Sequence, residues 1–166
     1  MKPADLIVTQ WGCRFHGRTL PCSIGRSGIT DDKQEGDGAT PRGTMRIVGM
    51  LWRADRLPPG VVPPWARAIG PGDLWSDDVA DPAYNHLVRA PHPFSHERLR
   101  RADPMYDIVL LTDWNWPDST PGRGSAIFLH QWRRPRLGTA GCVAFSRRDL
   151  LWLAGRVQRG TRVILR

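Results

Sequence analysis

The chain has 166 residues but only three cysteines, Cys13, Cys22 and Cys142. They form no Cys-x-x-Cys pair and no cysteine–histidine cluster at zinc spacing, so we expect no structural metal. No run of about 18 apolar residues occurs, which excludes a membrane-spanning helix. The sequence also lacks a phosphate-binding Gly-Lys-Ser/Thr loop and a Rossmann fingerprint, so nothing in it indicates a nucleotide cofactor.

Lysine is also scarce, because only Lys2 and Lys33 stand among the 24 basic residues and the rest are arginines. The formal net charge is +8, and such an excess favours acidic partners such as nucleic acid, anionic polymers or membrane surfaces. The arginines, however, are scattered from Arg14 to Arg166 instead of clustered on one predicted helix. This spread favours a solvated basic surface, so we expect no nucleic-acid partner.

The N-terminal segment lacks the features of a secretion signal. Its only basic residue before the first apolar stretch is Lys2, and Asp5 interrupts a stretch that is too short for the hydrophobic region of a signal peptide. We expect either a protein that is not exported by that route or a true start upstream.

Glycine and proline are plentiful, at 17 and 15 residues, and they are spread without repeats or low-complexity tracts, which is typical of short strands joined by defined loops. Strands are predicted at residues 6–8, 18–24, 44–51, 106–113, 125–130 and 161–165, the first two around a turn at His16 and Gly17. Residues 25–43 are expected to form an ordered loop, and residues 57–81 an insertion over the core. Cys13 and Cys22 either pair across the hairpin or are two independent buried thiols.

One helix is predicted near the C-terminus. Ser146 and Asp149 have the Ser-x-x-Asp spacing of a capping box, and an apolar helical face follows between residues 150 and 157. Gly160 would end this helix. The chain is thus predicted to fold as a single mostly β domain, residues 1–166, with one clear helix.

The stretch with the clearest chemistry is IFLHQWRRPRLGTAGCVA, residues 127–144. A cysteine attacks as its thiolate, and a neighbouring imidazole can take the thiol proton and return it to a leaving amine. His130 ends one predicted strand and Cys142 begins the next, so adjacent strands would bring both side chains to the same end of a sheet. Gly141 permits close approach of a carbonyl, and the N–H groups of Ala140, Gly141 and Cys142 could form an oxyanion hole. Spacing alone leaves open whether Cys142 is a nucleophile or a core residue.

Two motifs in this chain resemble those of a known family. His130, the loop after it and the segment Thr139-Ala140-Gly141-Cys142 resemble the active-site signature of L,D-transpeptidases, the YkuD-like family, in which a His precedes a Ser/Thr-His-Gly-Cys segment. Far upstream, residues 33–43 (KQEGDGATPRG) resemble the family's Lys-x-x-Gly-Asp-x-x-Thr-Pro-x-Gly loop. The likeness runs from about Gly25 to the final strand, and two motifs in the right order are more specific than either alone.

The resemblance implies a mostly β, sandwich- or barrel-like domain that needs no metal or cofactor. In this family the cysteine attacks the carbonyl after the third residue, an L-centre, of a peptidoglycan stem peptide and expels the terminal D-alanine. The thioester is then resolved by an amine of a neighbouring stem, which gives a cross-link, by water, which gives carboxypeptidase activity, or by a free D-amino acid. The type of cross-link, between two diaminopimelate residues or to the L-Ala end of a stem, stays open.

Carried over residue by residue, the resemblance makes Cys142 the nucleophile and His130 the base. Gly141 and Cys142 would supply oxyanion donors, and Thr139 would shape the substrate pocket. The backbone carbonyl of Gln131 would orient the imidazole, so no catalytic Asp is required.

The chain departs from the family pattern near the cysteine. Ala140 stands where the common signature has His, and Ala144 stands where the family often has Arg. The loop between the two catalytic positions is shorter than usual and carries Trp132 and Arg136, which either meet stem carboxylates or glycan or are simply solvated. The substrate pocket is therefore expected to differ from the family's usual one.

Other candidate residues have weaker support. Asn115, just beyond a predicted strand, is either a turn residue or lines the cleft. His92 and His96 have the i,i+4 spacing of a helical metal pair, but the prolines around His92 disfavour a helix there, so we discount zinc. Glu97 and Arg101 are expected to hold a segment against the core, with substrate contact as the alternative.

We expect a monomeric enzyme of the periplasm or cell envelope, because mature peptidoglycan exists only there, with stem peptides as its partners. The alternatives are an L,D-carboxypeptidase or amidase-like hydrolase that resolves the thioester with water, and a non-catalytic peptidoglycan-binding module whose basic surface meets stem carboxylates.

Overall fold

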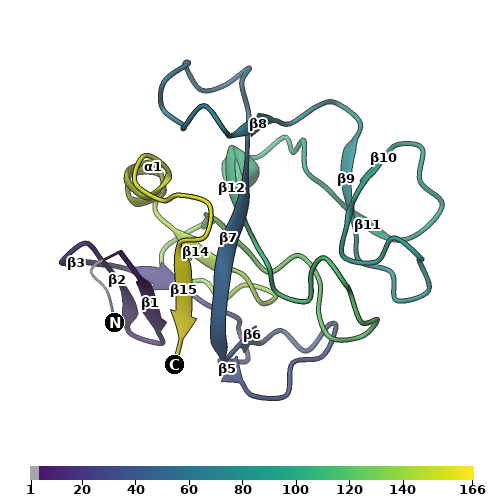
Figure 1. Ribbon diagram of the computed structural model, residues 1–166, viewed down its shortest axis with the longest axis horizontal. Helices are drawn as coiled ribbons and strands as arrows, with labels where there is room; N and C mark the ends of the chain where they lie inside the picture. The colour runs from purple at the N-terminus through teal and green to yellow at the C-terminus, as the bar shows by residue number, and fades with distance from the viewer. Residues whose placement is uncertain (1–3) are drawn as a thin grey trace.

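The computed structural model describes residues 4–166, which form one large sheet, two small sheets and one α-helix (Figure 1). The large sheet has ten strands, in the order β3 (Arg18–Leu20), β2 (Gly12–Phe15), β1 (Leu6–Thr9), β15 (Arg162–Leu165), β7 (Gly43–Trp52), β12 (Ile108–Thr112), β13 (Phe128–Gln131), β14 (Val143–Phe145) and β4 (Cys22–Ser23), with β8 (Arg67–Ala68) paired to β7. Its two ends, β3 and β4, are joined by Pro21 alone, so the sheet must curl until it is nearly closed. The predicted mostly β, barrel-like class is confirmed.

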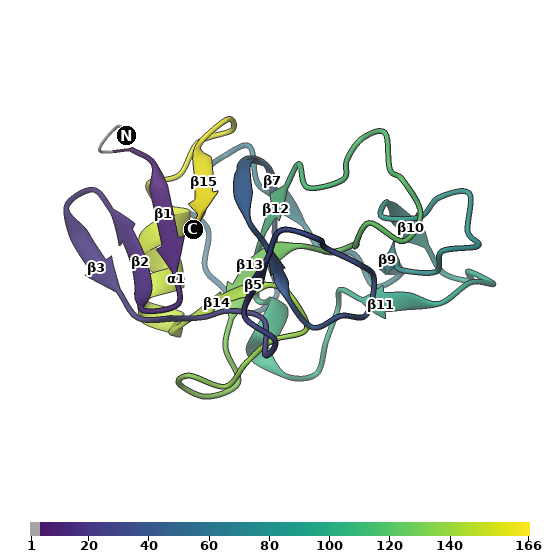
Figure 2. The ribbon, with the colours of Figure 1, turned by 90° about the horizontal axis from the view of Figure 1, so that it is seen from below.

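Two small sheets complete the fold. β9 (Asp73–Ser76) lies between β10 (Leu87–Arg89) and β11 (His96–Arg98), and β5 (Ile29–Thr30) pairs with β6 (Thr40–Pro41). Figures 1 and 2 show the three-stranded sheet at the opposite end of the molecule from β1, β2 and β3. Residues 25–43, expected to be a loop without a strand, contain the two-residue strands β5 and β6, and the expected insertion at residues 57–81 contains β8 and β9. The partners of these short strands are not revealed by a local pattern.

The predicted strands at residues 6–8, 44–51, 106–113 and 161–165 correspond to β1, β7, β12 and β15. The strand predicted at residues 18–24 is instead divided at Pro21, which has no N–H for a ladder hydrogen bond, into two strands at opposite ends of the sheet. The strand predicted at residues 125–130 begins only at Phe128, because Ala126 adopts a φ of +52° and breaks the extended run.

The helix α1 (Arg147–Ala154) begins as predicted, with Ser146 Oγ accepting the Asp149 N–H at 3.1 Å. It ends earlier than the predicted Gly160, because the N–H groups of Arg156 and Val157 both donate to the carbonyl of Leu153, which stops the helical ladder. The helix buries Leu150, Leu153 and Ala154 against the barrel.

Two apolar clusters form the core. The larger one fills the barrel, and its members include Leu6, Val8, Met45, Ile47, Leu129, Val143 and Leu165. The smaller one joins the three-stranded sheet to the barrel, with the Trp75 and Phe128 rings edge-to-face at a centroid distance of 4.9 Å. Cys142 packs against this second cluster. The cysteine therefore lies at the packed junction between the two sheets.

Cys13 and Cys22, whose pairing the sequence left open, are free thiols on β2 and β4. Burial raises the pKa of both thiols, that of Cys22 to about 12, so both are inert at neutral pH. Within residues 4–166, no helix has the length and apolar character needed to cross a bilayer.

Candidate active site

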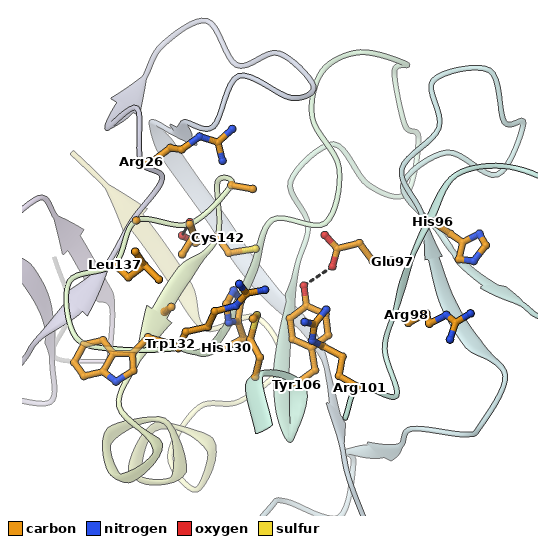
Figure 3. Close-up of a pocket in the computed structure, with 16 residues that line it drawn as sticks. Arg26, His96, Glu97, Arg98, Arg101, Tyr106, His130, Trp132, Leu137 and Cys142 are labelled. Atoms are coloured by element: carbon orange, nitrogen blue, oxygen red, sulfur yellow. Dashed lines mark hydrogen bonds between the residues drawn. The ribbon is translucent and has the colours of Figure 1, made fainter. Parts of the chain in front are cut away.

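Cys142 and His130 are brought together by two neighbouring strands. β13 and β14 run parallel, with Leu129 opposite Val143 and His130 opposite Ala144, and Cys142 comes one residue before β14. Both side chains line a cavity of about 570 Å³ at the junction of the barrel and the three-stranded sheet (Figure 3). The sequence placed both residues at strand ends, and the parallel pairing is what makes them neighbours.

The Cys142 thiol is held in its neutral form. Its Sγ lies 3.0 Å from the carbonyl oxygen of Ala126, to which it donates, and 3.4 Å from the N–H of Phe128, from which it accepts. Burial raises the pKa of Cys142 to about 12, and the negative charge of Glu97 acts in the same direction. The thiol therefore has to lose its proton to a base before it can attack.

The His130 imidazole is suited to be that base. Its Nδ1 lies 2.8 Å from the carbonyl oxygen of Gln131, and because a carbonyl only accepts, Nδ1 carries the proton and Nε2 is left as an acceptor. Burial lowers the pKa of His130 to about 4, against the effect of the Gln131 hydrogen bond. The Tyr106 ring packs edge-on against the imidazole at a centroid distance of 5.3 Å and fixes its plane. Across residues 4–166, no hydrogen bond joins the imidazole to the thiol.

Thr139 organises the backbone before the cysteine. Its Oγ1 donates to the carbonyl oxygen of Cys142 at 2.6 Å and accepts the N–H of Gly141 at 3.1 Å. The Gly141 N–H, expected from the sequence as an oxyanion donor, is thus engaged by Thr139 in this structure. Gly141 has a φ of +146°, and a Cβ at this position would lie 2.9 Å from the carbonyl oxygen of Ala39, so only glycine fits without strain.

The upstream loop supports this segment directly. Arg26 donates its N–H to the carbonyl oxygen of Thr139 at 2.9 Å, and Thr139 donates its own to Ile24 at 2.9 Å. Thr40 Oγ1 accepts the N–H of Gly25 at 2.8 Å, which ties the second half of the loop to the first. The two motifs that lie far apart in the sequence therefore meet at the cysteine.

Inside the loop, the buried Lys33 and the partly buried Asp37 form an ion pair with Nζ 2.5 Å from Oδ1. Asp37 also accepts the N–H groups of Gln34 and Ala39, both at 2.8 Å. Burial opposes ionisation of Asp37, but these hydrogen bonds and the Lys33 contact outweigh it and lower the pKa. The ion pair thus fixes the turn that presents Ala39 to Gly141.

The facing wall of the cavity comes from a part of the chain that the sequence assigned to the core. Glu97 and Arg98 on β11, together with Arg101 and Tyr106, line the cavity opposite Cys142 (Figure 3). Glu97 accepts a hydrogen bond from the Tyr106 hydroxyl. Glu97 and Arg101, which the sequence expected to hold a segment against the core with substrate contact as the alternative, thus line the cavity and also contact Tyr106 and Asp103.

The remaining candidates divide between the cavity and its surroundings. Trp132, Thr139 and Ala140 line the cavity, whereas Arg136 and Asn115 do not. Arg136 lies in the adjacent hollow beside Trp11, at a φ of +62°. Asn115 is a turn residue with a φ of +49°, whose side chain bonds to Thr120 and to the carbonyl of Gly124.

The histidine pair discounted as a metal site lies in irregular chain and a strand. His92 Nε2 lies 2.7 Å from Asp81 Oδ2, and His96 lies on β11. In the part of the chain that the structure describes, no group of three or more His, Cys, Asp or Glu side chains is placed to hold a metal ion.

Comparison with known families agrees with this geometry. A family model for the L,D-transpeptidase catalytic domain (YkuD) matches residues 14–165. The match includes the loop at residues 33–43 and the segment from His130 to Cys142. Comparison with curated proteins and with solved structures gives no match. Because the family model covers nearly the whole chain, the chain belongs to the L,D-transpeptidase catalytic domain family.

Proposed function

We propose that this chain is a peptidoglycan L,D-transpeptidase in which Cys142 is the nucleophile and His130 the general base. The observation that carries the proposal is the shared cavity, to which adjacent parallel strands contribute the thiol and an imidazole whose Nε2 can accept a proton. Residues 1–166 act as one catalytic domain in this proposal. The family acts on peptidoglycan, and its stem peptides are the substrates we assign.

Acylation follows from the positions of these two groups. The thiol turns away from the Ala126 carbonyl, gives its proton to Nε2 of His130 and attacks the stem carbonyl carbon. The new C–S bond forms, the C–N bond to the terminal D-alanine breaks, and His130 returns the proton to the leaving nitrogen. Backbone N–H groups of Ala140 and Cys142 are the oxyanion donors we assign, and the Gly141 N–H joins them when it leaves Thr139.

Resolution of the thioester decides the type of enzyme. An amine of a second stem gives a cross-link and frees the Cys142 thiol, whereas water in its place gives a carboxypeptidase. We propose the amine as the natural acceptor.

The cavity wall suits the carboxylates of a stem peptide. Arg26, Arg98 and Arg133 line the cavity, and within residues 4–166 none of the three forms an ion pair with a carboxylate. Arginine binds carboxylates through paired hydrogen bonds in a fixed geometry. We assign these three side chains to recognition of the stem carboxylates. They would take the place of the arginine that the family often has at the position of Ala144.

A carbapenem tests the nucleophile. We expect intact-mass spectrometry to show one carbapenem adduct on the wild-type protein and none on Cys142→Ala, while Cys22→Ala, a matched control for a buried thiol, keeps the adduct. A non-catalytic binding module would bind sacculi without forming any adduct.

Muropeptides test the reaction. Mass spectrometry after incubation of purified protein with stem peptides should show cross-linked dimers and released D-alanine. Release of D-alanine without dimers would identify a hydrolase instead.

The periplasm or cell envelope is the location that this reaction requires, and it is the usual location of the family. Fractionation of cells that produce the full-length protein should find it with the envelope fraction. Recovery only in the cytoplasm would contradict this assignment.

A further inference from the structure

Glu97 is an unusual group in the cavity because, among the described residues of the wall, it is the one carboxylate beside four arginines. Its carboxylate accepts a hydrogen bond from the Tyr106 hydroxyl. Arg101 does not pair with it, because the Arg101 guanidinium donates to the Asp103 carboxylate instead, with Nε 2.9 Å from Oδ1 and Nη2 2.6 Å from Oδ2. Among residues 4–166, no cation lies within 4.0 Å of the Glu97 carboxylate. Several of its acceptor positions are therefore open toward the cavity.

The surroundings of Glu97 make a local negative site. Burial raises the pKa of Glu97, and the carboxylates of Asp77 and Glu35 act in the same direction. In the described part of the chain, Oδ1 of Asp77 is buried and has no hydrogen-bond partner. Two carboxylates held close together and away from water are costly unless a cation joins them. The site therefore favours a positively charged ligand.

The position of Glu97 relates this site to the reacting sulfur. Its carboxylate points into the cavity toward Cys142 in Figure 3, and its charge reaches the thiol strongly enough to raise the pKa of Cys142. To form a cross-link, the proposed reaction must bring the acceptor amine to this sulfur. At neutral pH a side-chain amine arrives as an ammonium ion, since its pKa is about 10.4.

We propose that Glu97, held by Tyr106, binds the ammonium group of the acceptor stem and positions its nitrogen for attack on the Cys142 thioester. This inference rests on the proposed transpeptidase function. In the step itself the N–C bond forms and the C–S bond breaks. Of the two protons that the nitrogen loses, one returns through His130 to the sulfur and the other leaves to solvent, and Glu97 is unchanged.

The test compares Glu97→Gln with Glu35→Gln. Gln keeps the size of Glu and an oxygen that can accept the Tyr106 hydroxyl, but it removes the charge. Glu35 is the control, because it accepts the hydroxyl of Tyr84 in the same kind of contact but does not line the cavity. Its charge reaches Glu97, so this variant separates a general change of charge near the site from loss of the carboxylate that faces the cavity. The probe is the tetrapeptide stem L-Ala–γ-D-Glu–meso-diaminopimelate–D-Ala, which serves as donor and as acceptor. Mass spectrometry measures Cys142 acylation and the ratio of cross-linked to hydrolysed product.

For Glu97→Gln we expect this ratio to fall about 10- to 100-fold at low acceptor concentration, the range for loss of a hydrogen bond between charged groups. The acylation rate should not fall, since loss of the Glu97 charge removes one of the causes that raise the pKa of Cys142. The melting temperature should stay near that of the wild type, and a high acceptor concentration should restore much of the ratio. Glu35→Gln should keep the wild-type ratio. Tyr106→Phe keeps the Glu97 carboxylate but removes the hydroxyl that donates to it, so it should lower the ratio by a smaller factor. It serves as the second variant if Glu97→Gln does not fold.

An unchanged ratio of cross-linked to hydrolysed product in Glu97→Gln would overturn this inference and leave the proposed function intact. An equal loss of acylation and cross-linking would also overturn it, because that result would place Glu97 on the donor side or in a structural role. A wild-type protein that forms the acyl-enzyme but only hydrolyses it would also overturn it. A wild-type protein that forms no adduct at all would overturn the proposed function as well.

Discussion

Gly141 and Ala39 come from motifs about a hundred residues apart, yet the space where a Gly141 side chain would begin is filled by the Ala39 carbonyl oxygen, 2.9 Å away. The contact joins the loop at residues 33–43 to the residue before the nucleophile. It explains in physical terms why both motifs occur in one chain, because the loop sets the backbone that presents Cys142.

Gly141→Ala should therefore destabilise the protein and the site together. The φ of +146° costs a non-glycine residue about 1–3 kcal/mol, and the overlap with the Ala39 carbonyl adds a similar amount. Denaturant unfolding should show this loss, and Cys142 acylation should fall with it. Gly60→Ala is the control, since it has a φ of +90° and no atom within 4 Å of the added Cβ, and it should cost only about 1 kcal/mol. Equal losses in the two variants would contradict the importance of the Ala39 contact.

Acylation should respond to pH as a reaction of a neutral thiol and a neutral imidazole. With the pKa of His130 lowered to about 4 by burial, the base remains unprotonated well below neutral pH. The rate constant for carbapenem adduct formation should stay near its plateau at pH 5.5 and be half-maximal near pH 4. A midpoint near the ordinary histidine pKa of about 6.5 would contradict this.

The same shift predicts how stability depends on pH. Between about pH 6.5 and pH 4 the unfolded chain binds a proton at His130 that the folded chain does not, so the free energy of unfolding falls as the pH falls through this window. The loss due to His130 is at most about 3 kcal/mol. Unfolding curves of His130→Gln should show a correspondingly smaller loss between pH 7 and pH 4, and parallel losses in the two proteins would contradict the assignment.

Asp37→Asn should show the value of the ion pair inside the loop. The Lys33 side chain is 3 % exposed and that of Asp37 is 24 % exposed, so the substitution removes the carboxylate partner of a buried ammonium that still donates to the Gln34 carbonyl. We expect a loss of about 1.5–3 kcal/mol in the free energy of unfolding. Asp31→Asn, which removes a pair between exposed side chains of the same loop, should change stability by less than about 1 kcal/mol. Chemical denaturation of both variants measures the two losses in the free energy of unfolding. Similar losses would show that the Lys33–Asp37 pair stabilises the protein no more than a surface ion pair does.

Much of the fold was predictable because its main strands and its helix carry local signals. The apolar runs of β1, β7, β12 and β15 and the capping residues of α1 are visible in the sequence. The division at Pro21 and the three-stranded sheet were missed. Closure of the barrel and the pairing of very short strands depend on partners distant in the chain, which periodicity does not report.

The sequence by itself identified the proposed nucleophile and base, Cys142 and His130, and the loop at residues 33–43, since these carry recognisable motifs. Only the tertiary structure decided what surrounds them. It placed Glu97 and Arg101 in the cavity wall, left Asn115 in a turn and engaged the Gly141 N–H with Thr139. The physical reason is that a nucleophile and its base need particular residue types at particular positions, whereas a substrate wall needs only suitable side chains that packing brings together from any part of the chain.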